Sequence, residues 1–438
     1  MKTSIFQMVL IGVFALAILA GVIVFALTKG KTDSINVINL TVWGTESESP
    51  MVPFFATFFQ SQSDTHIIKY VQKNESIFYN DLLEALSRGT APDVILISQD
   101  SLLQYKDKIF ITPFETYPVR TFRDSFVEES ELFVVPEGIA AFPFSIDPLV
   151  LYWNRDIFSQ AGVATPPKFW DEVLFLTPRL TKRDAARNIT SSAIALGNFS
   201  NVSNAKEVLS AMLLQVGNPI VSSSGGNYQS ALAEMVGNFS GTASVLDFYS
   251  EFGNPLKSVY SWNPALPISK TMFTNGNLAM YIGFASDAYD IRAKNPNLNF
   301  DVTYLPQLRD AKTRVTFGSI KAFAILSSSK NKDKALTTIS EVTGVNGIML
   351  WTKLSGLPPV RRELLFSSGQ NDPYQLIFSQ SALSSRGWLD PNKTETNVIF
   401  SSLVEGVSSG RLPVHEAILD AERNLDDLLK PFQKNETI

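Results

Sequence analysis

Apolar and polar residues follow two different periods between residues 37 and 97. Short runs rich in β-branched residues alternate with segments in which apolar residues recur with the helical period. The predicted strands are Val37–Val42, Thr65–Val71 and Val94–Ile97, and the predicted helices between them are Met51–Phe59 and Phe78–Arg88. This alternation of strands and helices is typical of an α/β domain built on a parallel sheet.

Parallel sheets of this kind bind ligands beyond the carboxyl ends of their strands. The segments that follow the first and third predicted strands are Trp43–Glu46 and Ser98–Ser101. We therefore expect both segments to lie on one rim of the sheet. For Trp43, a place in the hydrophobic core is the alternative.

The stretch from Ala140 to Trp170 organises the rest of the chain. Its extended segment Ala140–Phe144 contains Pro143, which has no N–H and is not expected in a central, fully paired strand. Asp147 follows as a candidate buried carboxylate, and the apolar run Leu149–Trp153 comes next. A strand that leaves one sheet, bends at a proline and enters another is what the hinge of a two-lobed protein requires, so we predict a hinge here.

The remaining chain mixes helical and strand patterns. The predicted helices are Phe169–Leu176, Lys206–Leu214, part of Ala231–Phe252, Lys332–Thr343, Val345–Leu354, Asn397–Val407 and Val414–Leu429. The predicted strands are Ser191–Leu196, Leu278–Phe284, Phe300–Leu305, Thr313–Phe317 and Ile320–Leu326. We expect the last two to form a second crossing between the lobes, broken at Gly318-Ser319.

The N-terminal segment Phe6–Thr28 carries no charged residue and is almost wholly apolar. About 20 apolar residues in a helix cover the roughly 30 Å hydrocarbon core of a membrane, whereas a cleaved signal has an apolar core of about 7–15 residues. We therefore predict one N-terminal transmembrane helix, with its tether, over residues 1–35. The large C-terminal part would then lie on the extracytoplasmic side of the cell membrane. A cleaved signal peptide is the alternative.

Composition excludes several classes of function for this chain of 438 residues. Its net charge of −5 leaves no basic surface for nucleic acid. The absence of cysteine excludes disulfides and thiolate chemistry, and the two histidines, His66 and His415, exclude a histidine-rich zinc site. No phosphate-binding glycine loop or G-x-S-x-G motif is present, and no carboxylate pair stands out. We predict no enzyme activity, no catalytic residue, no metal site and no cofactor.

A series of motifs resembles one known family in order and spacing. The first are Leu40-Thr-Val-Trp-Gly44, Ala91-Pro-Asp-Val-Ile95, Phe142-Pro143 and Tyr152-Trp153-Asn154-Arg155-Asp156-Ile157-Phe158. Next come Pro166-Pro167, Trp170-Asp171-Glu172, Asn277-Leu-Ala-Met280, Leu305-Pro306, Gly318-Ser319, Gly356-Leu357-Pro358 and Glu416-Ala417. Together they are similar to family 1 of the extracellular solute-binding proteins of ABC transporters, the carbohydrate-binding group that includes maltose-binding protein. The chain departs from the family pattern at Trp153, inserted between Tyr and Asn, and at Glu172, which directly follows Asp171.

The resemblance implies an α/β, two-lobed periplasmic-binding-protein-like fold of type II, with a solute in the cleft between the lobes. The N-terminal lobe would be residues 36–145 plus 320–357, and the C-terminal lobe residues 150–316 plus 358–438. A monomer of this kind would bind a small solute, expected to be a sugar, close around it and deliver it to an ABC transporter permease. A membrane-tethered sensor or interaction module without transport is the alternative, and an enzyme on the same scaffold is a third reading.

The resemblance also implies the residues that contact the solute. They are Trp43, Thr45, Ser98, Gln99, Asp100, Phe144, Asp147, Phe284, Ser286 and Trp388. Sugars present an apolar ring face and a belt of hydroxyls, which suit flat aromatic side chains and fixed acceptors such as aspartate. Filling of the core is the alternative role for these aromatic residues. At Ile97, Ser286 and Asn397 the maltose-binding pattern has aromatic residues, so the solute need not be maltose-like.

Overall fold

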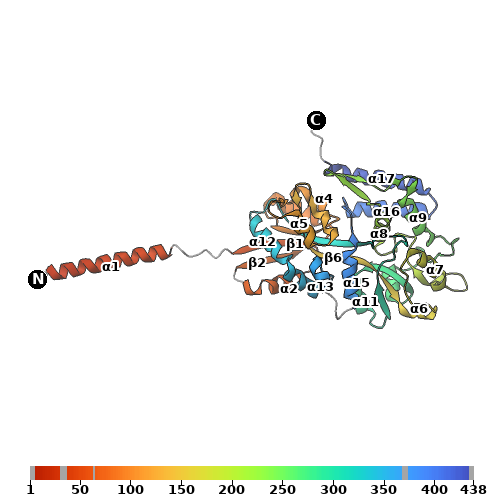
Figure 1. The fold of residues 1–438 in the computed structure, drawn as a ribbon, viewed down its shortest axis with the longest axis horizontal. Helices are drawn as coiled ribbons and strands as arrows, with labels where there is room; N and C mark the ends of the chain where they lie inside the picture. Colours follow the sequence, from red (N-terminus) through yellow and green to blue (C-terminus); the bar gives the residue numbers. More distant parts are fainter. Residues whose placement is uncertain (1–4, 30–36, 63–64, 367–372, 434–438) are drawn as a thin grey trace, which may run out of the picture.

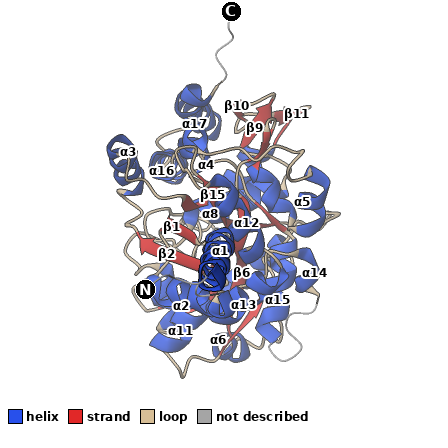
Figure 2. Cartoon of the chain, turned by 90° about the vertical axis from the view of Figure 1, so that its left-hand side faces the viewer, coloured by secondary structure: helices blue, strands red, loops and turns tan. Residues whose placement is uncertain are grey.

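Two lobes joined by two long strands make up the protein in the computed structural model, which describes residues 5–29, 37–62, 65–366 and 373–433 (Figure 1). Each lobe has a hydrophobic core of its own. In Figure 1, α2 and α12 lie on one side of the molecule and α7 and α9 on the other, with β6 between them. Figure 2 shows α3 and α5 at opposite edges of the molecule.

The N-terminal lobe begins with the strand and helix order that the sequence predicts. β1 (Ile38–Gly44) lies between β2 (His66–Gln72) and β3 (Val94–Ser98), and all three strands are parallel. Because they run in the same direction, their carboxyl ends meet at one edge of the sheet. The connecting helices are α2 (Glu48–Phe58) and α3 (Phe78–Arg88). α3 ends at Gly89, whose φ of +68° suits glycine.

The rest of the N-terminal lobe consists of shorter elements and three later helices. They are α4 (Leu102–Tyr105), α5 (Val119–Ser125), the 3₁₀ segment η3 (Glu128–Phe133), β4 (Val134–Val135), β5 (Gly138–Ile139), α12 (Lys332–Val342), α13 (Val345–Ser355) and α14 (Arg362–Leu365). Val360 and Leu365 belong to the core of this lobe. The predicted lobe boundary at residues 357/358 stays a proposal, and the packing favours a slightly later position.

Two strands, β6 (Phe142–Asn154) and β15 (Thr316–Ile325), pass from one lobe to the other. They pair in an antiparallel manner from Phe142 to Pro148 of β6. Beyond Pro148, β6 pairs with β13 and β14 of the C-terminal lobe, whereas the other end of β15 pairs with β3 of the N-terminal lobe. The crossing predicted around Asp147 is therefore present, as one uninterrupted strand.

The predicted break at Gly318-Ser319 is wrong, because β15 continues through both residues. Gly318 does not form a turn, and the small size of its side chain matters for packing. A Cβ atom at residue 318 would collide with the side chains of Glu129 and Ser385, so glycine leaves room for the buried Glu129 carboxyl group where it lies. The pairing of β15 with β6 does have one shift in register, which lies between Lys321 and Ala322 of β15.

The C-terminal lobe is built on β13 (Leu278–Phe284), which pairs with β6 and with β8 (Ile189–Ile194). Its helices are α6 (Arg155–Gln160), α7 (Trp170–Leu180), α8 (Ala205–Gln215), α9 (Gly241–Glu251), α10 (Ser269–Thr274), α11 (Asp287–Lys294), α15 (Pro373–Leu383), α16 (Lys393–Ser408) and α17 (Val414–Leu429). Its other strands are β7 (Lys182–Arg183), β9 (Val221–Ser224), β10 (Asn227–Ser230), β11 (Met235–Val236), β12 (Phe239–Ser240), β14 (Phe300–Thr303) and β16 (Ser385–Arg386).

The apolar N-terminal segment forms a helix, α1 (Ile5–Lys29), whose apolar side chains from Met8 to Ile23 are exposed. The side chains of α1 are described from Met8 to Ile23 only, which is shorter than a membrane span. Over the residues that the structure describes, no helix meets the length and apolar character needed to cross a membrane. The structure therefore does not support the transmembrane helix that we predict from the sequence.

Candidate ligand-binding cleft

A cavity of about 810 Å³ lies between the two lobes. On the N-terminal side it is bordered by the segments that follow β1, β2 and β3. On the C-terminal side it is bordered by the first turns of α8 and α16. The lining residues are Thr45, Asn74, Glu75, Ser76, Phe78, Tyr79, Asn80, Leu96, Ile97, Ser98, Asp100, Ser101, Gln104, Tyr105, Lys206, Glu207, Asn392, Lys393, Thr394, Asn397 and Val398.

The N-terminal wall of the cavity contains an aromatic group. The ring of Tyr105 lies 5.7 Å from that of Phe78 and 5.4 Å from that of Tyr79, measured between centroids. Burial raises the pKa of the Tyr105 hydroxyl, so it stays protonated at neutral pH. Phe78 and Tyr105 belong to the core of the N-terminal lobe, so this wall presents the half-buried ring of Tyr79 to the cavity, supported by the two buried rings behind it.

Polar acceptors lie beside the aromatic group, in the turn after β3. The hydroxyl of Ser98 donates a hydrogen bond to Oδ1 of Asp100. The hydroxyl of Ser101 donates to the carbonyl oxygen of Ser98 at 3.0 Å. These local bonds hold the Asp100 carboxylate at the edge of the cavity, where its second oxygen faces a lysine from the other lobe.

That lysine, Lys393 in the first turn of α16, joins the two walls of the cleft. Its Nζ lies 2.8 Å from Oε1 of Glu75 and 3.8 Å from Oδ2 of Asp100. Burial by itself would lower the pKa of Lys393, but the two carboxylates outweigh burial and raise it. Asn392 fixes the start of α16, because its side chain accepts hydrogen bonds from the backbone N–H groups of Thr394 and Glu395.

A buried ion pair supports the C-terminal wall from behind. Nζ of Lys206, on α8, donates to Oδ2 of Asp390 at 2.7 Å, and the two side chains are only 5% and 3% exposed. Thr396 also donates its hydroxyl to Asp390 at 2.7 Å. The ion pair between Lys206 and Asp390 connects α8 to the loop before α16, so it positions the residues of both helices that face the cavity.

The deep end of the cleft reaches the crossing strands. A smaller cavity of about 60 Å³ is bordered there by Gln99, Phe284, Phe317, Ser319 and Trp388, together with Asp100, Lys206, Glu207, Asp390 and Lys393. The side-chain amide of Gln99 forms two hydrogen bonds within the protein. It donates to the Gly318 carbonyl at 3.1 Å and accepts from the Ile320 N–H at 2.9 Å. Gln99 thus binds the hinge strand β15 in this structure.

The structure brings six of the predicted contact residues to these cavities. Thr45, Ser98 and Asp100 border the large cavity, and Gln99, Phe284 and Trp388, with Asp100 again, border the small one. Trp388 is 4% exposed, and its Nε1 donates to Oγ of Ser210 at 3.1 Å. Its ring is therefore held mainly by the C-terminal lobe.

Phe144 and Trp43 lie elsewhere. Phe144 is fully buried in the N-terminal lobe, with its ring centroid 4.7 Å from those of both Phe323 and Trp351. Trp43 packs against the same core, and Nζ of Lys73 lies 3.8 Å from its ring centroid. Neither side chain belongs to the site that we propose below.

Asp147 and Ser286 lie together at the hinge. The Ser286 N–H donates to Oδ1 of Asp147 at 3.1 Å. Burial raises the pKa of Asp147 to about 7, although the hydrogen bonds from Ser286 and the charge of Lys321 oppose this rise. Whether either residue contacts a solute stays a prediction.

Sequence reasoning missed the residues contributed by the start of α3 and the start of α16, chiefly Glu75, Tyr79 and Lys393. The position of Glu75 and Tyr79 after a parallel strand could have indicated that they border the cleft. The segment after β2 shares its edge of the sheet with the segments after β1 and β3, because the three strands are parallel. Nothing in the local sequence, by contrast, indicates that α16 lies across from them.

Comparisons with known proteins agree with this architecture. Residues 46–344 match the family described as bacterial extracellular solute-binding protein. The galactooligosaccharide-binding protein of Bacillus subtilis (strain 168) is 21% identical in an alignment 406 residues long that covers 89% of each chain. The sn-glycerol-3-phosphate-binding periplasmic protein of Yersinia enterocolitica is 22% identical over 421 residues, covering 86% of this chain and 88% of that one.

Two solved structures share the fold. The cyclic alpha-maltosyl-1,6-maltose binding protein from Arthrobacter globiformis matches with a TM-score of 0.74 and 17% identity, over 90% of this chain and 100% of that one. A cyclo/maltodextrin-binding protein complexed with maltotetraose matches with a TM-score of 0.72 and 15% identity, over 90% and 98%.

Proposed function

Since the chain belongs to the bacterial extracellular solute-binding proteins, we propose that it is an extracytoplasmic receptor that binds a carbohydrate between its lobes and delivers it to an ABC transporter. The observation that carries this proposal is the cavity of about 810 Å³ to which both lobes contribute side chains. A solute in such a cavity contacts both lobes at once, so its binding energy favours the closed arrangement.

The chemistry of the cavity supports a carbohydrate as the solute. Tyr79, which is half-buried, provides a flat face on which a sugar ring packs, and Phe78 and Tyr105 support that face from the core of the N-terminal lobe. Asp100 and Ser101 provide acceptors and a hydroxyl for the belt of OH groups of the sugar. The name of the Bacillus subtilis relative points to the same class of solute.

The charges of the cavity do not favour a phosphate ester such as sn-glycerol 3-phosphate. Glu75, Asp100 and Glu207 border the cavity with two lysines. Both lysines are already paired, Lys393 with Glu75 and Lys206 with the buried Asp390. A phosphate would therefore enter a cleft with more negative than positive groups and with no unpaired cation among its described lining residues.

Thermal unfolding of the full-length protein against a panel of solutes tests the proposal. A solute at about 100 times its dissociation constant adds roughly 2.7 kcal/mol to the stability of the protein. We expect one class of saccharide to raise the midpoint by a few degrees, and sn-glycerol 3-phosphate and amino acids to leave it unchanged. A shift with sn-glycerol 3-phosphate alone, or with none of the saccharides, would refute a carbohydrate receptor.

A further inference from the structure

A buried carboxyl group, that of Glu129, reaches from the N-terminal lobe into contact with the C-terminal lobe. Glu129 lies on η3, between Val127 and Phe133 of the N-terminal core. One of its oxygens lies against Gly318 of the crossing strand β15, and the other lies against Gly387, which directly follows β16. A hinge movement that separates η3 from β16 would therefore expose this carboxyl group to water.

The two glycines that contact Glu129 lie directly beside the deep end of the cleft. Phe317, Ser319 and Trp388 border the cavity of about 60 Å³ there. Gly318 lies between the first two of these residues, and Gly387 precedes the third. Phe317 and Trp388 also belong to the core of the C-terminal lobe. A displacement of either glycine would therefore move side chains that line the cleft.

The carboxyl group of Glu129 has no partner that would stabilise a negative charge in this position. It is 3% exposed, and neither oxygen has a hydrogen-bond partner among the described residues. Burial raises its pKa to about 8, although the charge of Arg386 opposes the rise. The packed arrangement therefore favours the protonated form, whereas a carboxyl group reached by water would ionise at its ordinary pKa.

The charged residues on the elements that pack against η3 are already paired. These elements are α5, β4, β15 and β16, and β4 consists of two valines. The pairs are Arg386 with Glu128, Lys321 with Glu46, Arg123 with Glu131, and Arg120 with Asp124. An ionised Glu129 would thus have to break the pair of Arg386 or gain access to water.

We propose that Glu129 is a positioning residue that links solute binding to the binding of one proton. The protonated carboxyl group fits between Gly318 and Gly387 and lets the lobes pack around the deep end of the cleft, whereas the ionised group favours separation of η3 from β16. The proton is exchanged with the solvent. This inference rests on the proposed function and adds a pH dependence to it: closure takes up a proton, so the affinity for the solute falls as the pH rises.

The size of the effect follows from the linkage between protonation and closure. A carboxyl group that ionises freely in the open form and stays protonated in the closed form changes the closing equilibrium by about tenfold per pH unit. Asp147 at the hinge, whose pKa is raised to about 7, titrates in the same range. The comparison of the wild type with Glu129→Gln, which cannot lose a proton, therefore isolates the contribution of Glu129.

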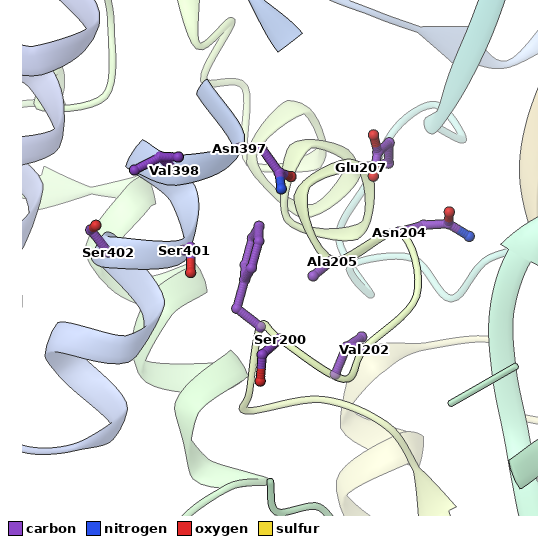
Figure 3. A pocket seen from close by; sticks show the side chains of 10 residues that line it. Ser200, Val202, Asn204, Ala205, Glu207, Asn397, Val398, Ser401 and Ser402 are labelled. Carbon is purple, nitrogen blue, oxygen red and sulfur yellow. The ribbon is translucent and has the colours of Figure 1, made fainter. Parts of the chain in front are cut away.

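Distances between the lobes test this inference without any solute. The chain has no cysteine, so Ser87→Cys on α3 and Ser402→Cys on α16, both exposed, direct two spin labels to the full-length protein. The first turns of these helices border the interlobe cavity from opposite lobes. Ser402 also borders a separate cavity of about 470 Å³, whose walls all belong to the C-terminal lobe (Figure 3). Its label therefore stays outside the interlobe cavity and reports the width of the cleft.

Pulsed electron paramagnetic resonance at pH 6 and pH 8 gives the ratio of longer to shorter distances. In the wild type we expect this ratio to rise by roughly tenfold or more between the two pH values, and in Glu129→Gln most of the rise should disappear. For a saccharide that binds, the dissociation constant should show the same rise and the same loss of it. Glu131→Gln, on the same 3₁₀ segment with a side chain that is 43% exposed, is the control and should follow the wild type.

Arg386→Gln provides a test that keeps Glu129 in place. It removes the charge that opposes the rise in pKa, so the pH at which the lobes separate should increase. A wild-type ratio that does not change with pH, a change that persists fully in Glu129→Gln, or a transition that Arg386→Gln leaves unmoved would overturn the role of Glu129. Failure of every saccharide to bind would refute the proposed function, and the label distances would still decide the role of Glu129.

Discussion

Replacing Asp390 with alanine is expected to lower the free energy of unfolding by about 3–5 kcal/mol, because it leaves the ammonium group of Lys206 buried without its counter-charge. Both side chains are almost completely buried, and their charged atoms lie 2.7 Å apart. Burial raises the pKa of Asp390, with the charge of Lys206 opposing that rise, so the carboxylate depends on its partner for ionisation. Chemical denaturation monitored by circular dichroism measures the loss.

Two controls show whether the loss comes from the unpaired charge. The double variant Lys206→Met, Asp390→Leu removes both charges and should recover most of the stability. Asp420→Ala breaks an ion pair with Arg423 whose side chains are 51% and 69% exposed. It should leave the free energy of unfolding within experimental error. An Asp390→Ala variant as stable as the wild type would show that the pair does not hold the wall of the cleft.

The second large effect is expected at Glu129, where glutamine should stabilise the protein at alkaline pH. Glu129 is 3% exposed, and neither of its carboxyl oxygens has a hydrogen-bond partner among the described residues. It lies against Gly318 of β15 and Gly387 next to β16, and the charged group that faces it is Arg386, which is paired with Glu128. Burial raises the pKa of Glu129 from 4.5 to about 8, although Arg386 opposes the rise.

The direction of the pH effect follows from this shift. Well below pH 4.5 the carboxyl is protonated in both the folded and unfolded states, so its ionisation has no effect on stability there. As the pH rises towards 8, the unfolded state loses the proton first, and the folded state is progressively destabilised. At about 1.4 kcal/mol per pKa unit the total loss is at most roughly 5 kcal/mol.

Unfolding experiments between pH 5 and pH 9 measure this difference. Glu129→Gln should come closest to the wild type in stability near pH 5, and its advantage over the wild type should grow until about pH 8. A smaller decline should remain in the variant, since Asp147 has its own pKa raised to about 7. Glu131→Gln, on the same 3₁₀ segment with a side chain that is 43% exposed, is the matched control and should follow the wild-type profile. Parallel profiles for wild type and Glu129→Gln would contradict the account.

Much of the fold follows from short-range pattern. The bounds predicted for β3, α3, β13 and α17 agree with the observed bounds within one residue. β3 and β13 are continuous apolar runs, α3 and α17 have a clear helical period, and each of the four has a glycine or proline nearby. The crossing strands were harder to predict. Gly318-Ser319 resembles a turn in sequence, but there the glycine makes room for the side chain of Glu129, which is far away in the sequence.

The candidate site could be predicted in part, for a similar reason. Thr45, Ser98 and Asp100 lie at or just beyond the carboxyl ends of parallel strands, so the sheet itself places them at the cleft. Lys393 reaches the same cavity from the end of the chain, and only the packing of α8 and α16 brings it there. Aromatic residues were the least predictable. Phe144 fills a core and Tyr79 borders the cleft, and no local feature of the sequence distinguishes the two roles.

The central claim is that a carbohydrate binds between the lobes, and titration calorimetry of the Asp100→Asn variant tests it most directly. The probe is the saccharide that stabilises the wild type most strongly. A hydrogen bond to a charged group contributes about 1.5–3 kcal/mol, so we expect the dissociation constant to rise by roughly 10- to 150-fold. Asp107→Asn, at a carboxylate that is 71% exposed and belongs to the N-terminal lobe, is the control and should bind as the wild type does. A folded Asp100→Asn variant with unchanged affinity would contradict a solute site between the lobes.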